Sequence, residues 1–365
     1  MTSKERVHAA LRREPVDRVP IFMWLHPGTA HRLGTHLGLP PHMVADALGN
    51  DVHQAWVGNN YAMEGIVHQT EGESHVDVWG IEWTKIGQFN QISRSPLEHA
   101  DTEELRNYTL PYHHIGELLA QMEPLFRHAG GYFIGCDVSP CIFEMICRIR
   151  GMENTILDLS ADPVLAEELI ERTALFEIAL AEAACERWPL DWLWTGDDVA
   201  GQQSMIMNPS LWRSMIRPRL SRIVDVGKKR KLRVAYHCCG SLRPIIPDLI
   251  EMGVDVLNPV QGNCPGMDPL ELKREFGRNL AFMGGLDTQE LLPKGTTKEV
   301  FRETSRLIEG MSADGGGYIL SASHTIPPET PLENVFAIYE AAGVSYEEIR
   351  DRASDLRRRD PPHSI

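Results

Sequence analysis

Short apolar runs recur along the second half of the chain, each followed by a segment that suits a helix. After residue 130 they read GYFIGCDV, DWLWTGDD, LRVAYHCC, VDVLNPV, LAFMGGLD and GYILSASH. Strands that alternate with helices build parallel sheets with crossover connections, so this rhythm predicts an α/β fold. Two more strands are expected nearer the N-terminus, in RVPIF and in DVHQAWVG at residues 51–58. Eight strands complete a TIM (β/α)8 barrel.

The competing architecture is an open doubly wound sheet. Its dinucleotide-binding form carries GxGxxG after the first strand, and the sequence has no such motif there. A chain of 365 residues also falls in the size range of one barrel with insertions. We therefore predict a single barrel domain over residues 1–365.

Residues 34–110 lack this rhythm, and we interpret them as an irregular insertion near the N-terminus of the barrel. Within them the stretch DVWGIEWTKIGQFNQIS alternates polar and apolar residues, as a small antiparallel hairpin does. Such an elaboration could serve as a lid.

Helix signals agree with this layout. Thr2 and Glu5 fit a capping box for an N-terminal helix, and Pro163 and Pro209 stand where helices are expected to start. Gly253 suits the C-cap of another helix.

The charge balance excludes several kinds of partner. The 51 acidic and 36 basic residues give a formal net charge of -15, which opposes attraction to nucleic acid or to anionic membranes. The opening MTSKERVHAALRREP lacks the apolar core of a signal peptide, so we expect a cytoplasmic protein. Seven cysteines, an odd number in a large acidic chain, are expected to be reduced.

Reactive residue types stand at the carboxyl end of most apolar runs. They are Asp137, Asp197, Asp198, His237, Cys239, Asn258, Gln261, Asp287 and His324. In a barrel these ends form one rim, where the loops build the active site, so the pattern predicts an enzyme. For any single aspartate, a role as helix N-cap is an equally good interpretation.

His237 and Cys239 suggest a metal site. Alternate residues of a strand face the same side, so these two side chains point together while Cys238 points away. An imidazole and a thiolate are two of the three protein ligands of an open catalytic zinc site. The candidate for the third ligand is His324, and Asp198 or a nearby carboxylate could be a fourth.

The alternative interpretation is packing. Cys238 and Cys239 would then be small buried hydrophobes, and His237 a hydrogen-bonding core residue. Cys264 is a less favoured substitute ligand, and structural roles are expected for Cys136, Cys141, Cys147 and Cys185.

Long stretches of the chain resemble the uroporphyrinogen decarboxylase superfamily. They are LRREPVDRVPIF, FEMICRIRGMENTILDLSADP, HCCGSLRPIIPDLIEMGVDVLNPVQ, MGGLDTQELLPKGT and GGGYILSASHTIPPETPLENVFAIYEA. The resemblance covers essentially the whole chain and implies a TIM barrel. The superfamily also contains cobalamin-linked methyltransferases that act with zinc and a thiol.

Two motifs separate the branches of this superfamily. The decarboxylases carry MRQAGR after the first strand, which holds the acidic side chains of the porphyrinogen through paired charges. The corresponding stretch here is MWLHPGTAHRL, with Arg32 as its only arginine, which disfavours that activity. The methyltransferases carry His-x-Cys, matched by His237 and Cys239, and a later cysteine, where this chain has His324.

The resemblance therefore implies a zinc-dependent methyltransferase. It would move a methyl group between a small methylated substrate or thiol and a cobalamin, free or on a partner corrinoid protein. Asp198, Tyr236 and Gln261 are expected to orient the substrate. An imidazole at His324 conserves zinc-binding capacity but removes one negative charge, which leaves the thiol substrate open.

Two alternatives and the oligomeric state stay open. One alternative is a metal-free decarboxylase in which aspartates and rim histidines handle protons. The other is a noncatalytic barrel that binds a tetrapyrrole or a corrinoid protein. The resemblance suggests a monomer or a homodimer.

Overall fold

The computed structural model describes residues 1–58, 70–127 and 130–359. The chain divides into two compact units. The first unit comprises Met1–His53, Gly130–Phe133 and Leu257–Ile365, and the second comprises Gln54–Ala129 and Ile134–Val256. The single domain expected over residues 1–365 stays a prediction.

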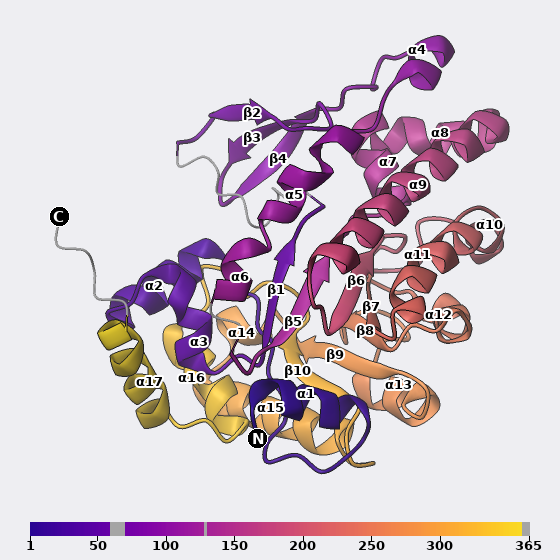
Figure 1. Ribbon diagram of the computed structural model, residues 1–365. Helices are drawn as coiled ribbons and strands as arrows, with labels where there is room; N and C mark the ends of the chain where they lie inside the picture. The colour runs from indigo at the N-terminus through magenta and orange to yellow at the C-terminus, as the bar shows by residue number, and fades with distance from the viewer. Residues whose placement is uncertain (59–69, 128–129, 360–365) are drawn as a thin grey trace. The chain divides into compact units, whose positions relative to one another are not determined.

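Seven strands belong to one sheet and follow the order in which they occur along the chain. They are β1 (Val52–Trp56), β5 (Phe133–Asp137), β6 (Trp192–Gly196), β7 (Arg233–His237), β8 (Val256–Val260), β9 (Ala281–Leu286) and β10 (Tyr318–Ala322) (Figure 1). The pairs β5–β6, β6–β7 and β9–β10 are parallel. A doubly wound sheet reverses its strand order at a switch point, so this order excludes that alternative. The predicted α/β class and the strand at residues 51–58 are confirmed.

The strand predicted at RVPIF is wrong as a regular strand. Ile21 makes only an isolated parallel bridge, to Leu320 of β10. Pro20 has no N–H to donate, and the N–H of Ile21 is bound by the Asp51 carboxylate at 2.8 Å. The N–H of Met23 similarly donates to the Asn50 side chain at 3.3 Å. Two N–H groups of the segment are thus bound by side-chain oxygens, whereas the Phe22 N–H still donates to the Leu320 carbonyl at 3.0 Å, so the contact with β10 is an isolated bridge and not a regular ladder.

Helices flank the strands in both units. Those of the first unit are α1 (Ser3–Leu11), α2 (Pro27–Leu37), η1 (Pro41–Met43), α3 (Val44–Leu48), α13 (Pro269–Phe276), α14 (Leu291–Lys294), α15 (Thr297–Met311), α16 (Leu332–Ala341) and α17 (Tyr346–Arg359). Those of the second unit are α4 (Thr102–Asn107), η2 (Tyr112–His114), α5 (Ile115–Ala120), α6 (Glu123–Arg127), α7 (Phe143–Arg150), α8 (Met152–Ala161), α9 (Pro163–Arg187), α10 (Pro209–Met215), α11 (Arg217–Lys229), η3 (Arg243–Ile245) and α12 (Ile246–Met252). No described helix has the length and apolar character needed to cross a bilayer.

The predicted helix ends are confirmed. Thr2 and Glu5 form the capping box of α1, and Pro163 and Pro209 begin α9 and α10. Gly253 ends α12 with a left-handed φ of 94°. That backbone conformation favours glycine because it crowds a Cβ atom.

The stretch 34–110 is more regular than expected where it is described. It holds the end of α2, then α3, β1 and α4, together with a three-stranded antiparallel sheet. This insertion sheet consists of β2 (Ser74–Val76), β3 (Glu82–Ile86) and β4 (Phe89–Arg94), so the predicted hairpin is confirmed and gains a third strand. Helices such as α3, with five residues, are too short to show a helical period in the sequence.

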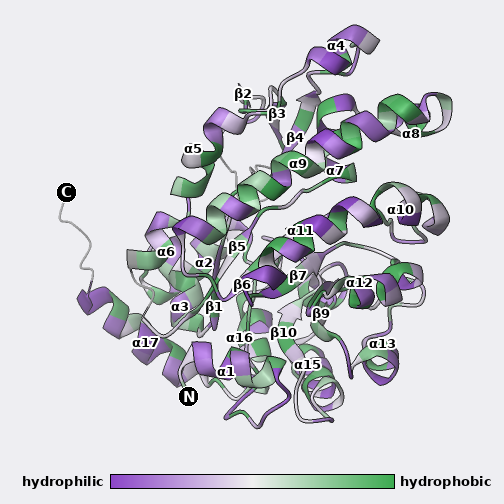
Figure 2. Cartoon of the chain, turned by 45° about the vertical axis from the view of Figure 1, so that its right-hand side comes forward, coloured by the Kyte–Doolittle hydropathy of each residue, from purple (hydrophilic) through white to green (hydrophobic). Residues whose placement is uncertain are grey.

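Helix α9 carries a buried carboxyl group. This helix packs on α11 with alternating apolar and polar positions along its length (Figure 2). Glu177 on its apolar side is fully buried, and neither of its carboxyl oxygens has a hydrogen-bond partner among the described residues. Burial raises the pKa of Glu177 well above its usual value, because the surroundings favour the uncharged form of the carboxyl.

Replacing Glu177 by glutamine is expected to flatten the pH dependence of stability. In the unfolded chain the carboxyl ionises near pH 4.5, whereas burial in the folded protein raises its pKa and favours the protonated form. The free energy of unfolding therefore falls as pH rises above that value, by up to about 1.4 kcal/mol per pH unit, until the folded pKa is passed. In urea unfolding, the free energy of unfolding of the variant relative to that of the wild type should be larger at pH 8 than at pH 5. Parallel pH profiles for the two proteins would contradict an uncharged Glu177.

Candidate metal centre

His237 and Cys239 bring two ligand atoms together at the end of β7. The Cys239 Sγ and the His237 Nε2 are 3.5 Å apart, and both side chains are partly exposed. A zinc ion about 2.3 Å from a thiolate sulfur and about 2.0–2.1 Å from an imidazole nitrogen, at tetrahedral angles, holds these atoms about 3.5 Å apart. The pair therefore fits the edge of a zinc coordination sphere.

Cys238 lies between them and belongs to the core. It is fully buried, and burial raises the pKa of its thiol well above its usual value. The chain then turns at Gly240, whose φ is 85° and where a Cβ atom would collide with the carbonyl oxygen of Gly201. This close approach of two backbones requires glycine, and it fixes the segment that carries Cys239.

Asp198, after β6, supports the pair. Its Oδ1 accepts the backbone N–H of Cys239 at 2.8 Å and lies 4.0 Å from the His237 Nε2. The carboxylate therefore fixes the backbone of one candidate ligand and lies close to the ring of the other. In metal sites, such outer carboxylates orient the ligands.

The neighbouring Asp197 has a different role. It is fully buried, and its two oxygens accept the N–H groups of Phe143 and Glu144 at 3.0 and 2.7 Å, which caps helix α7. Burial raises the pKa of Asp197 to about 7, against the two N–H groups that lower it. Asp137 is also buried and accepts the N–H of Ser139 at 2.8 Å. These contacts favour a structural role for Asp197 and Asp137.

Tyr236 lies behind the pair. It is fully buried, its hydroxyl donates to the Asp197 carbonyl at 3.2 Å, and burial raises its pKa well above the usual value. This hydrogen bond joins β7 to the loop after β6. The arrangement favours support of the strand end over contact between the Tyr236 hydroxyl and a substrate.

The remaining strand-end residues belong to the first unit. His324 follows β10 and is partly exposed, its Nδ1 accepts the Thr325 N–H at 2.8 Å, and its ring meets that of Trp24 edge-on at 6.3 Å. Asp287 accepts the N–H of Gln289 at 2.8 Å, as a turn residue does. Gln261 follows β8 and is partly exposed. The expected roles of His324 and Gln261 stay predictions.

The sequence did not point to Glu144 and Arg148 on α7. Glu144 accepts the N–H of Asp198 at 3.4 Å and forms an ion pair with Arg148 at 2.6 Å. The only signal in FEMICRIR is a glutamate four residues before an arginine, which is also typical of any exposed helix face.

Arg32 is engaged with the protein itself. Its guanidinium donates to the carbonyl oxygens of Pro328 and Thr330, the latter at 3.0 Å. The one arginine of MWLHPGTAHRL therefore holds a loop, instead of presenting its charge for paired recognition of a carboxylate.

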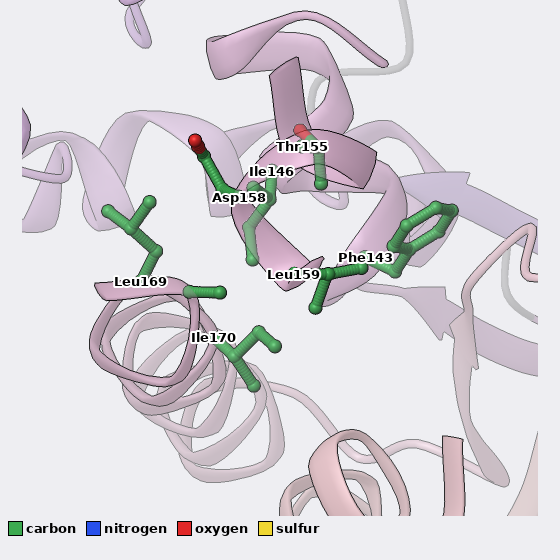
Figure 3. A pocket seen from close by; sticks show the side chains of 8 residues that line it. Phe143, Ile146, Thr155, Asp158, Leu159, Leu169 and Ile170 are labelled. Carbon is green, nitrogen blue, oxygen red and sulfur yellow. The ribbon is translucent and has the colours of Figure 1, made fainter. Parts of the chain in front are cut away.

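A small hollow in the second unit lies apart from this chemistry. It is enclosed by α7, α8 and α9, and none of the strand-end candidates lines it (Figure 3). Its lining is mainly apolar and consists of Phe143, Ile146, Thr155, Asp158, Leu159, Ala166, Leu169 and Ile170. Its one carboxylate, that of Asp158, is already paired with Arg150 at 2.9 Å, so the hollow is not favoured as an active site.

The chain is similar to proteins of known activity over most of its length. The family model for uroporphyrinogen decarboxylase (URO-D) matches residues 76–343. A methylcobamide:CoM methyltransferase of Methanosarcina mazei is 23% identical over 348 residues, covering 93% of this chain and 97% of that protein. A uroporphyrinogen decarboxylase of Thermus thermophilus is 29% identical over 182 residues, covering 48% of this chain and 46% of that protein.

A solved structure has the same fold. The methyltransferase from Methanosarcina mazei aligns with a TM-score of 0.69 at 19% sequence identity, covering 94% of this chain and 98% of that one. The family match spans well over half of the chain, and the relatives in it are enzymes. The chain is therefore an enzyme of the uroporphyrinogen decarboxylase (URO-D) family.

Proposed function

We propose that this protein is a zinc-dependent methyltransferase of the corrinoid-linked type. It moves a methyl group between a small methylated substrate or thiol and a cobalamin, free or on a partner corrinoid protein. The observation that carries the proposal is the 3.5 Å separation of the His237 Nε2 and the Cys239 Sγ, which suits zinc.

His324 is proposed as the third ligand. His324 would add a second imidazole nitrogen to the nitrogen and sulfur that His237 and Cys239 offer, and this donor set suits zinc. Three protein ligands leave one position of a tetrahedral site for a substrate. Zinc bound there would act as a Lewis acid that lowers the pKa of a thiol or other acceptor.

The protein side chains around the proposed metal centre hold the ligands and orient the substrate. Asp198 keeps Cys239 in place through its N–H, and the Tyr236 hydroxyl anchors the strand behind the pair. A bound methylcorrinoid would supply the methyl group and keep the electron pair of the broken bond, while the acceptor would form the new bond to that carbon and release its proton to solvent. Gln261 is proposed to orient the acceptor.

Two further observations support this branch of the family over decarboxylation. The relatives covered almost end to end by this chain are named methylcobamide:CoM methyltransferases. Arg32, the candidate for holding an acidic substrate, already binds two backbone carbonyls. A porphyrinogen with several carboxylates needs paired cations that this stretch does not supply.

We also infer that the sheet closes as an eight-stranded TIM barrel, with the segment after Pro20 in the eighth position. Ile21 and Leu25 each bridge in parallel to residues of or after β10, and the N–H of Asp51, which precedes β1, donates to the Ile21 carbonyl at 2.8 Å. The segment therefore has hydrogen bonds to the surroundings of both terminal strands of the sheet.

The test is anaerobic incubation of the zinc-loaded protein with methylcobalamin and a panel of thiols, alcohols and amines. We expect loss of the methylcobalamin absorption with at least one acceptor, and recovery of that acceptor in methylated form. Chelation of the metal should stop the reaction and added zinc should restore it. A protein that takes up no zinc when zinc is supplied would overturn the proposal.

A further inference from the structure

Glu144 joins helix α7 to the loop that carries Asp198. One of its oxygens accepts from the Arg148 guanidinium at 2.6 Å, and the other accepts the N–H of Asp198 at 3.4 Å. In return, the N–H of Glu144 donates to Asp197 in the same loop at 2.7 Å. The loop caps the helix and the helix side chain caps the loop, as the two halves of a capping box do within one helix.

Arg148 extends this connection to the insertion sheet. Its guanidinium lies 5.5 Å from the centre of the Trp83 ring on β3. Trp83 is buried, and its ring N–H donates to Asp77 at 2.8 Å, which fixes the orientation of the ring. A guanidinium over an aromatic face is attracted by it, the more so when water is excluded. The arginine therefore contacts the insertion sheet on one side and Glu144 on the other.

These contacts form a continuous path to the candidate ligands. Asp198, held by Glu144 through its N–H, accepts the N–H of Cys239 at 2.8 Å and lies 4.0 Å from the His237 Nε2. Each step lies within the second unit. Loss of the Glu144 carboxylate would free the backbone at Asp198, and with it the acceptor of the Cys239 N–H.

We propose that Glu144 and Arg148 are positioning residues of the metal centre, which hold Asp198 and thereby the His237–Cys239 pair in ligand geometry. The effect on metal affinity rests on the proposed function, whereas the effect on the backbone of the pair does not. Outer partners of metal ligands commonly change metal affinity by about 10- to 100-fold when removed.

Arg150 provides a matched control on the same helix. Its side chain is 12% exposed, as is that of Arg148, and it forms an ion pair with Asp158 at 2.9 Å. Its other described hydrogen bonds go to backbone carbonyls, among them those of Leu97 and Ala100 at 2.7 and 3.2 Å, and not to the loop at Asp198. Its replacement therefore tests what loss of a mostly buried arginine and its ion pair on α7 does without a change at that loop.

The first measurement needs no metal. Hydrogen–deuterium exchange of the Asp198 and Cys239 amides is compared in the wild type and in Arg148→Gln, Glu144→Gln and Arg150→Gln. We expect exchange at both amides to be at least about tenfold faster in the first two variants and unchanged in the third. Glu144→Gln keeps the shape of the side chain but offers a neutral amide oxygen, a weaker acceptor for the Asp198 N–H than the carboxylate, so it serves if Arg148→Gln does not fold. Wild-type exchange at these amides in both would overturn the inference.

The second measurement is metal affinity, by competition with a chelator for zinc and by the thiolate absorption band of the cobalt(II) form. We expect about 10- to 100-fold weaker binding and a shifted band for Arg148→Gln, partial recovery with Arg148→Lys, and no change with Arg150→Gln. Equal affinity for wild type and Arg148→Gln would overturn the positioning role while the proposed function stands. A wild type that binds no metal would instead overturn the proposed function, and the exchange experiment would still decide the inference.

Discussion

Replacing Cys239 by serine is expected to abolish stoichiometric zinc binding. The thiolate contributes both a ligand atom and a negative charge, whereas a serine hydroxyl is neutral at pH 7 and binds zinc poorly. Loss of a direct ligand should cost more than the roughly 100-fold that loss of an outer partner costs. Elemental analysis of the purified variant, together with chelator competition, measures the effect. His237→Ala is expected to behave in the same way.

Cys238→Ala is the control for this experiment. It removes a thiol from the adjacent position, but that thiol is fully buried and its pKa is raised by burial. The variant should bind zinc as the wild type does and lose only some stability. If Cys239→Ser retained zinc with wild-type affinity, the pair would have to be interpreted as packing, and the proposed metal centre would fall with it.

Replacing Asp51 by alanine is expected to lower the free energy of unfolding by about 3–5 kcal/mol. The Asp51 side chain is fully buried and forms ion pairs with Arg6 at 2.5 Å and Arg18 at 2.7 Å. It also accepts the N–H of Ile21 at 2.8 Å. The variant leaves charged and polar groups in the interior without their acceptor, which costs far more than an exposed ion pair contributes.

Asp17→Ala serves as the comparison. Asp17 also pairs with Arg6, at 2.7 Å, but its side chain is 42% exposed. Water can replace it, so we expect a loss of about 1 kcal/mol or less. Urea unfolding of both variants measures the difference. Similar losses for Asp17→Ala and Asp51→Ala would contradict the view that Asp51 anchors the segment next to β10.

The strands and the His237–Cys239 pair could be predicted because both depend on local pattern. Apolar runs with helices between them specify parallel strands, and the period of two along a strand end places alternate side chains together. The structure follows this pattern closely at β7, where Cys239 and His237 approach and Cys238 is buried.

The different roles of Asp197 and Asp198 could not be predicted from the sequence. They are adjacent, both follow WLWTG, and both suit a helix cap or a catalytic acid. Their roles differ because Asp197 meets the N-terminus of α7 while Asp198 meets the Cys239 N–H. These partners lie about 40 to 55 residues away in sequence. The roles of Glu144 and Arg148 could not be predicted for the same reason, because they depend on contacts between α7 and a loop that is distant in sequence.

The prediction of a regular strand at RVPIF was wrong for a different reason. Its composition suits a strand, but the Ile21 N–H donates to the Asp51 side chain, and the Phe22 N–H donates to a backbone carbonyl of β10, that of Leu320 at 3.0 Å. Strand propensity describes how a residue fits a pleated surface and does not specify which group accepts its N–H. A regular ladder was therefore a reasonable expectation that tertiary contacts overrode.

The first unit is built from segments that lie far apart in sequence, and this affects its folding during synthesis on the ribosome. Its N-terminal part must wait for residues from the other end of the chain, such as Gly277, whose carbonyl accepts from Arg13 at 3.0 Å. At about 5–20 residues per second, the 264 residues from Arg13 to Gly277 take about 13–53 s to translate. All of the second unit emerges in that interval. The nascent chain can therefore fold its middle before its beginning, while the N-terminal segment stays open to chaperones.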